Sequence, residues 1–176
     1  MIWNIGKTMS GSATKIICIP ECLAFLYPTE IRITENDTYR ILGGPKQISS
    51  VGESYTGLIN QALEAAPIPA GSLLRLKGKR RSFSAIVYDL DQDPICDPDW
   101  LASILDEIFK LTNRDSIKSI AMPVMGIAHS RLDAGCFLRL FRQSLANHQN
   151  HGLELIVFLD ESRKPSRVFP PFAEIH

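Results

Sequence analysis

The sequence of 176 residues lacks several features that would each point to a particular class of protein. It has no apolar run of about 18 residues, the length that a membrane-spanning helix needs, so we expect no membrane partner. Its 19 basic and 19 acidic residues leave no excess of positive charge, which argues against a nucleic-acid partner. Its start, MIWNIGKTMSGS, lacks the charged and then apolar layout of a secretion signal, so we expect a cytoplasmic protein.

Cysteine is also scarce, with only Cys18, Cys22, Cys96 and Cys136. Without a secretion signal, free thiols are expected rather than disulfides. A zinc site usually shows two close pairs of ligands, and only one loose pair is present here. We therefore predict no metal site and no cofactor, and we interpret the cysteines as small buried apolar residues.

What the sequence does contain is an alternation of strands and helices. Short apolar, β-branched segments predict strands at 14–19, 72–78, 82–90, 116–125 and 153–160. Apolar residues at helical spacing predict helices at 54–66, 97–111 and 132–148. This order indicates an α/β protein with three layers, α/β/α, around a mixed and mostly parallel sheet.

The whole chain, 1–176, is predicted to form one domain, with an inserted hairpin and loop at about 22–52 and a proline-rich tail at 161–176. The hairpin is expected at 30–42, where EIRIT and TYRIL flank END. Asp97 is predicted to cap the second helix, with Pro98 in its first turn. Ser130 and Asp133 have the spacing of a capping box for the third helix.

One segment has the layout of a phosphate-binding site: AMPVMGIAHSRLDAG, residues 121–135. An apolar strand leads into a loop opened by Gly126, and an amphipathic helix follows. Backbone N–H groups and a helix N-terminus bind phosphate, and Arg131 and His129 offer further contacts. Because the loop has only one glycine, its residues taken alone favour a plain connection between strand and helix.

Two common catalytic motifs are missing. Gly6-Lys7-Thr8 imitates the end of a P-loop, but neither an earlier glycine nor a predicted strand precedes it, so we reject an NTPase. No G-x-S-x-G nucleophile elbow is present, and no catalytic set stands out.

The order of elements resembles that of the macro domain, a module that binds ADP-ribose. The segment IKSIAMPVMGIAHSRLDAGCFLRLFRQSL is similar to the family's strand, glycine loop and helix, and LELIVFLDE to its last core strand. The family also has a G-D-[IV]-T stretch, then a strand ending in N-A-A-N and a glycine-rich stretch. Twelve residues separate the family's first glycine from its first asparagine, as they separate Gly6 from Cys18.

This resemblance implies a ligand site and also shows where it is altered. Lys7 stands where the family has the aspartate that binds adenine, and Glu21 where it has the asparagine that meets the distal ribose and serves turnover in hydrolytic members. Gly57 fits the glycine that starts the next helix. The family's phosphate loop is replaced by Gly126, Ile127, Ala128, His129, Ser130 and Arg131. Since a lysine can only donate, Lys7 cannot copy the adenine contact, and we expect unmodified ADP-ribose to bind weakly or not at all.

Three functions remain open. The first is a binding module for a nucleotide or an ADP-ribose-related phosphate ligand. The second is a scaffold that has lost its ligand and contacts a protein partner through the hairpin and the Phe-rich tail. The third is an ADP-ribosyl hydrolase with Glu21 as its catalytic candidate, and the missing asparagine and stacking aromatic argue against it.

Overall fold

The computed structural model describes residues 2–7, 13–40, 66–76, 81–148 and 152–160. Three predicted features therefore lie wholly or almost wholly outside the described residues: the helix at 54–66, the loop at 43–52 and the tail at 161–176.

A seven-stranded mixed sheet forms the centre of the described part, in the order β1-β2-β7-β6-β3-β5-β4. Its strands are β1 Ile2–Lys7, β2 Ala13–Pro20, β3 Ile31–Asp37, β4 Leu73–Leu76, β5 Arg81–Tyr88, β6 Ser119–Pro123 and β7 Leu155–Asp160. The inner strands, from β2 across to β5, run parallel, and both edge strands run antiparallel to their neighbours. The predicted mixed and mostly parallel sheet is confirmed.

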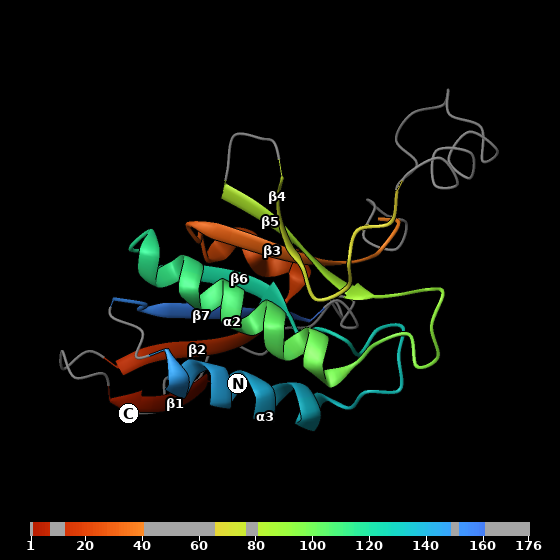
Figure 1. Cartoon of the computed structure of the whole chain (residues 1–176). Helices are drawn as coiled ribbons and strands as arrows, with labels where there is room; N and C mark the ends of the chain where they lie inside the picture. The colour runs from red at the N-terminus through yellow and green to blue at the C-terminus, as the bar shows by residue number, and fades with distance from the viewer. Residues whose placement is uncertain (1, 8–12, 41–65, 77–80, 149–151, 161–176) are drawn as a thin grey trace.

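Helices cover one face of this sheet and a short 3₁₀ helix covers part of the other. Helices α2, Pro98–Arg114, and α3, Ala134–Asn147, lie side by side on the first face (Figure 1). Ile120 and Ile156 pack in the core beneath them. The next residues, Ala121 and Val157, pack on the second face with Ala24 of the 3₁₀ helix η1, Glu21–Leu26, and with Tyr27, which follows it. Strands buried on both faces read as continuous apolar runs, which is why β5 and β7 are so apolar in sequence. None of the helices in the described ranges is long and apolar enough to cross a membrane.

The helix caps match the sequence for α2 and not for α3. Asp97 caps α2 by accepting the N–H of Asp99 at 2.7 Å, as predicted. Helix α3 begins at Ala134, and its cap is Asp133, which accepts the N–H of Cys136 at 2.7 Å. The predicted capping box is therefore wrong. Ser130 closes the preceding loop instead, donating to the Gly126 carbonyl and accepting the Leu132 N–H at 3.1 Å.

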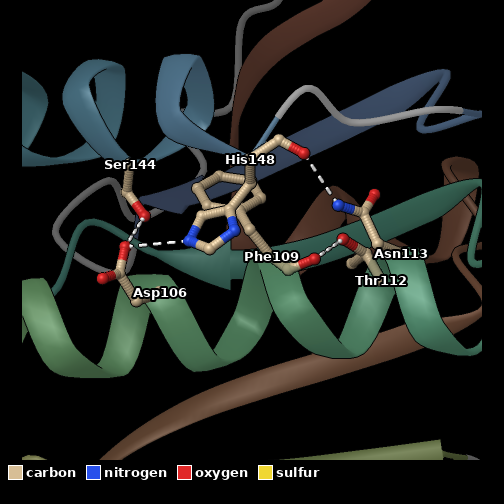
Figure 2. Close-up of polar contacts among 6 residues, drawn as sticks. All are labelled: Asp106, Phe109, Thr112, Asn113, Ser144 and His148. Atoms are coloured by element: carbon tan, nitrogen blue, oxygen red, sulfur yellow. Dashed lines mark hydrogen bonds and ion pairs between the residues drawn. The ribbon is translucent and has the colours of Figure 1, made fainter.

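A polar cluster fastens α3 to α2 (Figure 2). The Ser144 hydroxyl donates to Asp106 Oδ1 at 2.5 Å, and His148 Nε2 lies 3.1 Å from the same oxygen. Asn113 donates to the His148 carbonyl at 2.8 Å, and the Phe109 ring lies 6.3 Å from the imidazole. The hydrogen bond from Ser144 is the main cause that lowers the pKa of Asp106 below its ordinary value. The cluster stabilises the carboxylate and fixes the end of α3 against α2.

The strand β3 contradicts one prediction and the strand β1 was missed. Residues 30–37 do not form the first arm of a hairpin: Ile31–Asp37 is one strand that pairs in parallel with β5 and β6. Its polar end, END, was interpreted as a turn, but neighbouring strands bury it, and Asp37 is fully buried. The residues before Lys7 form an edge strand that the sequence analysis did not predict.

Candidate functional site

The carboxyl ends of the parallel strands meet at one edge of the sheet, which we call the rim. It is defined by the last residues of these strands: Pro20, Asp160, Pro123, Asp37 and Tyr88. In open α/β sheets, ligands bind outside the carboxyl ends of the strands, so the rim is the place to look for a site.

Gly126 is held at the rim by its backbone conformation, its packing and a hydrogen bond. Its φ of +80° lies in the left-handed region, which favours glycine. A Cβ at this position would lie 3.0 Å from Leu101 Cδ1 and 3.3 Å from Cys96 Sγ, so side chains of helix α2 and of the loop before it would have to shift to accept one. The Gly126 N–H donates to Glu35 Oε2 at 3.0 Å, which joins the loop after β6 directly to the end of β3.

Polar groups are buried where β3 and β5 end. Asp37 Oδ1 accepts the N–H of Tyr39 at 2.8 Å, and the Thr38 N–H donates to the Tyr88 carbonyl at 2.9 Å. The side-chain hydroxyls of Thr38 and Tyr88 are buried and have no hydrogen-bond partner among the described residues. A buried hydroxyl without a partner costs about 1–3 kcal/mol, so these two hydroxyls are the donors and acceptors at the rim that the described residues leave unused.

The Glu35 carboxylate contributes to the raised pKa values of two groups at the rim, Tyr88 and Cys96. Burial raises the pKa of Tyr88 far above its ordinary value, the Glu35 carboxylate adds to this rise, and the His129 amide opposes it. The Tyr88 hydroxyl thus lies near both groups without the geometry of a hydrogen bond to either. Burial also raises the pKa of Cys96 to about 12, with Glu35 adding and Ser130 opposing. Both groups are therefore uncharged at neutral pH.

A hollow lies on the η1 face, away from the loop 126–131. Its volume is about 330 Å³, and its lining includes Arg32, Arg81, Tyr27 and Val157. The side chain of Phe25 belongs to the same lining and is 76% exposed. No group of three or more His, Cys, Asp or Glu side chains in the described part of the chain is arranged to hold a metal ion.

Comparison with known proteins shows a likeness in structure alone. No family model matches the chain, and no curated protein is significantly similar in sequence. The macrodomain of Oceanobacillus iheyensis, solved with MES bound, matches at a TM-score of 0.61, 13% identity, and coverage of 92% of this chain and 90% of that one. The macrodomain of Thermus aquaticus DarG matches at 0.54, with 14% identity and coverage of 82% and 98%. The macro domain of ganglioside induced differentiation associated protein 2 matches at 0.53, with 16% identity and coverage of 82% and 75%.

The chain has the macrodomain fold. The fold expected from the order of elements is thus confirmed, and it holds over almost the full length of the first of these structures.

Within this fold, the predicted site residues separate into two groups. The loop residues 126–131 all lie at the rim: Gly126 is buried, Ile127 and Ser130 are half-buried, and Ala128, His129 and Arg131 are exposed. Lys7 pairs with Ala13, the first residue of β2, so its backbone lies at the opposite edge of the sheet from Pro20. Seven residue steps along β2 make that separation about 23 Å.

Glu21 follows Pro20, the rim residue of β2, and begins η1. Its carboxylate pairs with Arg32 at 2.5 Å on the face opposite α2. Gly57 lies outside the described residues. The alignment of Gly6 with the family's first glycine therefore does not bring Lys7 to the rim.

The residue of β3 that contacts the loop is Glu35, which accepts the Gly126 N–H. It was missed because END, residues 35–37, was interpreted as the turn of a hairpin. The sequence does contain a signal that β3 corresponds to the N-A-A-N strand of the macrodomain pattern. Glycines follow that strand in the pattern, and Gly43-Gly44 follow β3 here.

Proposed function

We propose that this macrodomain is a binding module for a nucleotide or an ADP-ribose-related phosphate ligand, held at the rim between the end of β3 and the loop 126–131. One observation carries the proposal. The Gly126 N–H already binds a negatively charged oxygen, the Glu35 carboxylate, at 3.0 Å, and a phosphate oxygen makes the same kind of contact.

Further features of the rim support a ligand of this class. The exposed Arg131 can pair with a phosphate, and helix α3 begins just after the loop. The unpartnered hydroxyls of Thr38 and Tyr88 suit the hydroxyl groups of a sugar. A mutant of the Oceanobacillus iheyensis macrodomain was solved with ADPR, at a TM-score of 0.59 and 16% identity to this chain.

We infer further that Glu35, Asn36, Asp37 and Thr38 take the place of the macrodomain N-A-A-N. This replaces neutral and small side chains with two acids and a hydroxyl, so the ligand is expected to differ from ADP-ribose near the distal ribose. An ADP-ribosyl hydrolase that uses Glu21 is not proposed, because Glu21 pairs with Arg32 on the other face.

Calorimetric titration tests the proposal with a panel of ADP-ribose, its terminally modified derivatives, NAD, guanine nucleotides and cyclic dinucleotides. A panel member should bind the wild-type chain and lose at least tenfold in affinity with Ala128→Glu, because the new carboxylate repels phosphate at an exposed loop position. The matched control is Ala146→Glu, which adds the same charge at an exposed position near the far end of α3. Equal affinities of the two variants, or no binding of any panel member, would contradict the proposal.

A second candidate function is contact with a protein partner. The observation that favours it is the exposed apolar pair on η1, Phe25 at 76% and Leu26 at 53%, beside the 330 Å³ hollow. Phe25→Ser should then remove a partner captured by the wild-type chain, whereas it should leave nucleotide binding at the rim unchanged.

A further inference from the structure

The contact between Glu35 and Gly126 is unusual for a phosphate loop, because a negatively charged side chain of the protein itself accepts the loop N–H. The end of β3 supplies a carboxylate, and its Oε2 occupies the N–H that opens the loop, across 91 positions of sequence. The left-handed φ of Gly126 and its close packing on Leu101 and Cys96 fix the direction of that N–H. An anionic ligand that needs this donor must therefore compete with a charge that is part of the protein.

A second hydrogen-bond donor lies close to the same carboxylate. Tyr88 is fully buried, and its hydroxyl has no hydrogen-bond partner among the described residues. Its ring lies edge-on to the ring of His129 in the same loop, with 5.4 Å between the centroids. The Glu35 carboxylate also contributes to the raised pKa of this hydroxyl, after burial. A hydroxyl can rotate to donate to a carboxylate. The Tyr88 hydroxyl can thus donate a hydrogen bond to the Glu35 carboxylate if that carboxylate leaves the Gly126 N–H.

We propose that Glu35 is a built-in competitor that determines the specificity of the rim: it holds the Gly126 N–H in the free protein, yields it to the phosphate of a ligand, and then accepts the Tyr88 hydroxyl. This inference rests on the proposed function, because it names the residue that sets which anions the site accepts. Weak anions fail to displace Glu35, and only ligands with enough further contacts do so.

The expected size of the effect follows from the bond that is exchanged. Hydrogen bonds to charged groups are strong enough that an unopposed phosphate should bind about ten- to a hundredfold more tightly than one that must displace a carboxylate. Replacing Glu35 by Gln removes the charge and keeps the size of the side chain, so the variant should bind anions more tightly than the wild type does. Removing the hydroxyl with Tyr88→Phe should have the opposite effect, because the displaced carboxylate then loses its alternative donor.

The test titrates wild type, Glu35→Gln, Tyr88→Phe and the control Glu30→Gln with two probes, ADP-ribose and inorganic pyrophosphate. Glu30 is a matched control because it has the same charge but lies just before β3, at the end of that strand away from the rim. There it accepts the Lys118 N–H at 3.2 Å. Binding is measured by calorimetry and by the amide NMR signal of Gly126, and thermal unfolding checks that each variant is folded.

Each outcome decides the question. Tighter binding of pyrophosphate to Glu35→Gln by tenfold or more, with no gain for Glu30→Gln and a loss for Tyr88→Phe, supports the inference. Equal or weaker binding to Glu35→Gln, or a Gly126 signal that does not move on that substitution, overturns it. If pyrophosphate shows the gain but no nucleotide binds any variant, the proposed function fails while the competitor role stands. If neither probe binds any variant, both fail.

Discussion

Replacing Gly126 by alanine should strongly destabilise the fold, independently of any ligand. Gly126 has a φ of +80°, and a left-handed conformation costs a non-glycine residue roughly 1–2 kcal/mol. The added methyl would lie 3.0 Å from Leu101 Cδ1 and 3.3 Å from Cys96 Sγ, and such overpacking of a core typically costs about 1–3 kcal/mol more. Together these give a loss of about 2–5 kcal/mol in the free energy of unfolding.

The chain offers a matched control that separates the two contributions. Gly152 also has a left-handed φ, +100°, but no atom of the described residues lies within 4 Å of the position of its Cβ. Gly152→Ala should therefore show the backbone strain alone, and the difference between the two variants should be the packing cost of about 1–3 kcal/mol. Urea unfolding of both variants at neutral pH measures this difference. Equal losses would show that Gly126 does not pack against Leu101 and Cys96 as described.

Three further predictions concern stability. Asp106→Asn should lower the free energy of unfolding at neutral pH and make that free energy fall less steeply in acid. The pKa of Asp106 is lowered from 3.8 in the folded state, so the carboxylate stabilises the fold above that value, and this stabilisation is lost as the pH falls through the folded pKa. Urea unfolding at pH 7 and pH 3 measures the difference. Asp97→Ala should cost about 1 kcal/mol in the same assay, because α2 loses its cap; no change would contradict that capping role. Tyr88→Phe should leave the melting temperature unchanged or raise it, because the hydroxyl has no partner among the described residues, and a clear fall would show that a partner exists.

Most strands of the sheet and helix α2 could be predicted from the sequence because both rest on local apolar patterns. Alternating or continuous β-branched residues identified β2, β5, β6 and β7, and a proline after an aspartate identified the start of α2. Such signals depend on residues close together in the chain. They are strongest where a strand is buried on both faces.

The end of β3 could not be predicted in the same way. Asn36, Asp37 and Thr38 are turn-forming residues by type, and local reasoning placed a turn there. They are in fact at most 9% exposed. Asn36 and Asp37 pair with Ile86 and Tyr88 of β5, and the Thr38 N–H donates to the Tyr88 carbonyl. These partners lie about 50 residues further along the chain, so local patterns could not reveal them. The same error moved the expected site to Lys7 and Glu21, because the strand that meets the loop had been counted as a hairpin.

The glycine that drew attention to the loop is therefore weak support for a ligand. Packing against Leu101 and Cys96 requires a glycine at position 126 whether or not phosphate ever binds there. Packing does not require a carboxylate on its N–H, nor the buried hydroxyls of Thr38 and Tyr88, which have no hydrogen-bond partner among the described residues. Buried hydroxyls without a partner raise the free energy of the fold. The functional question thus depends on Glu35, Thr38 and Tyr88 rather than on Gly126, and substitutions that leave the backbone of the loop intact are the ones that can answer it.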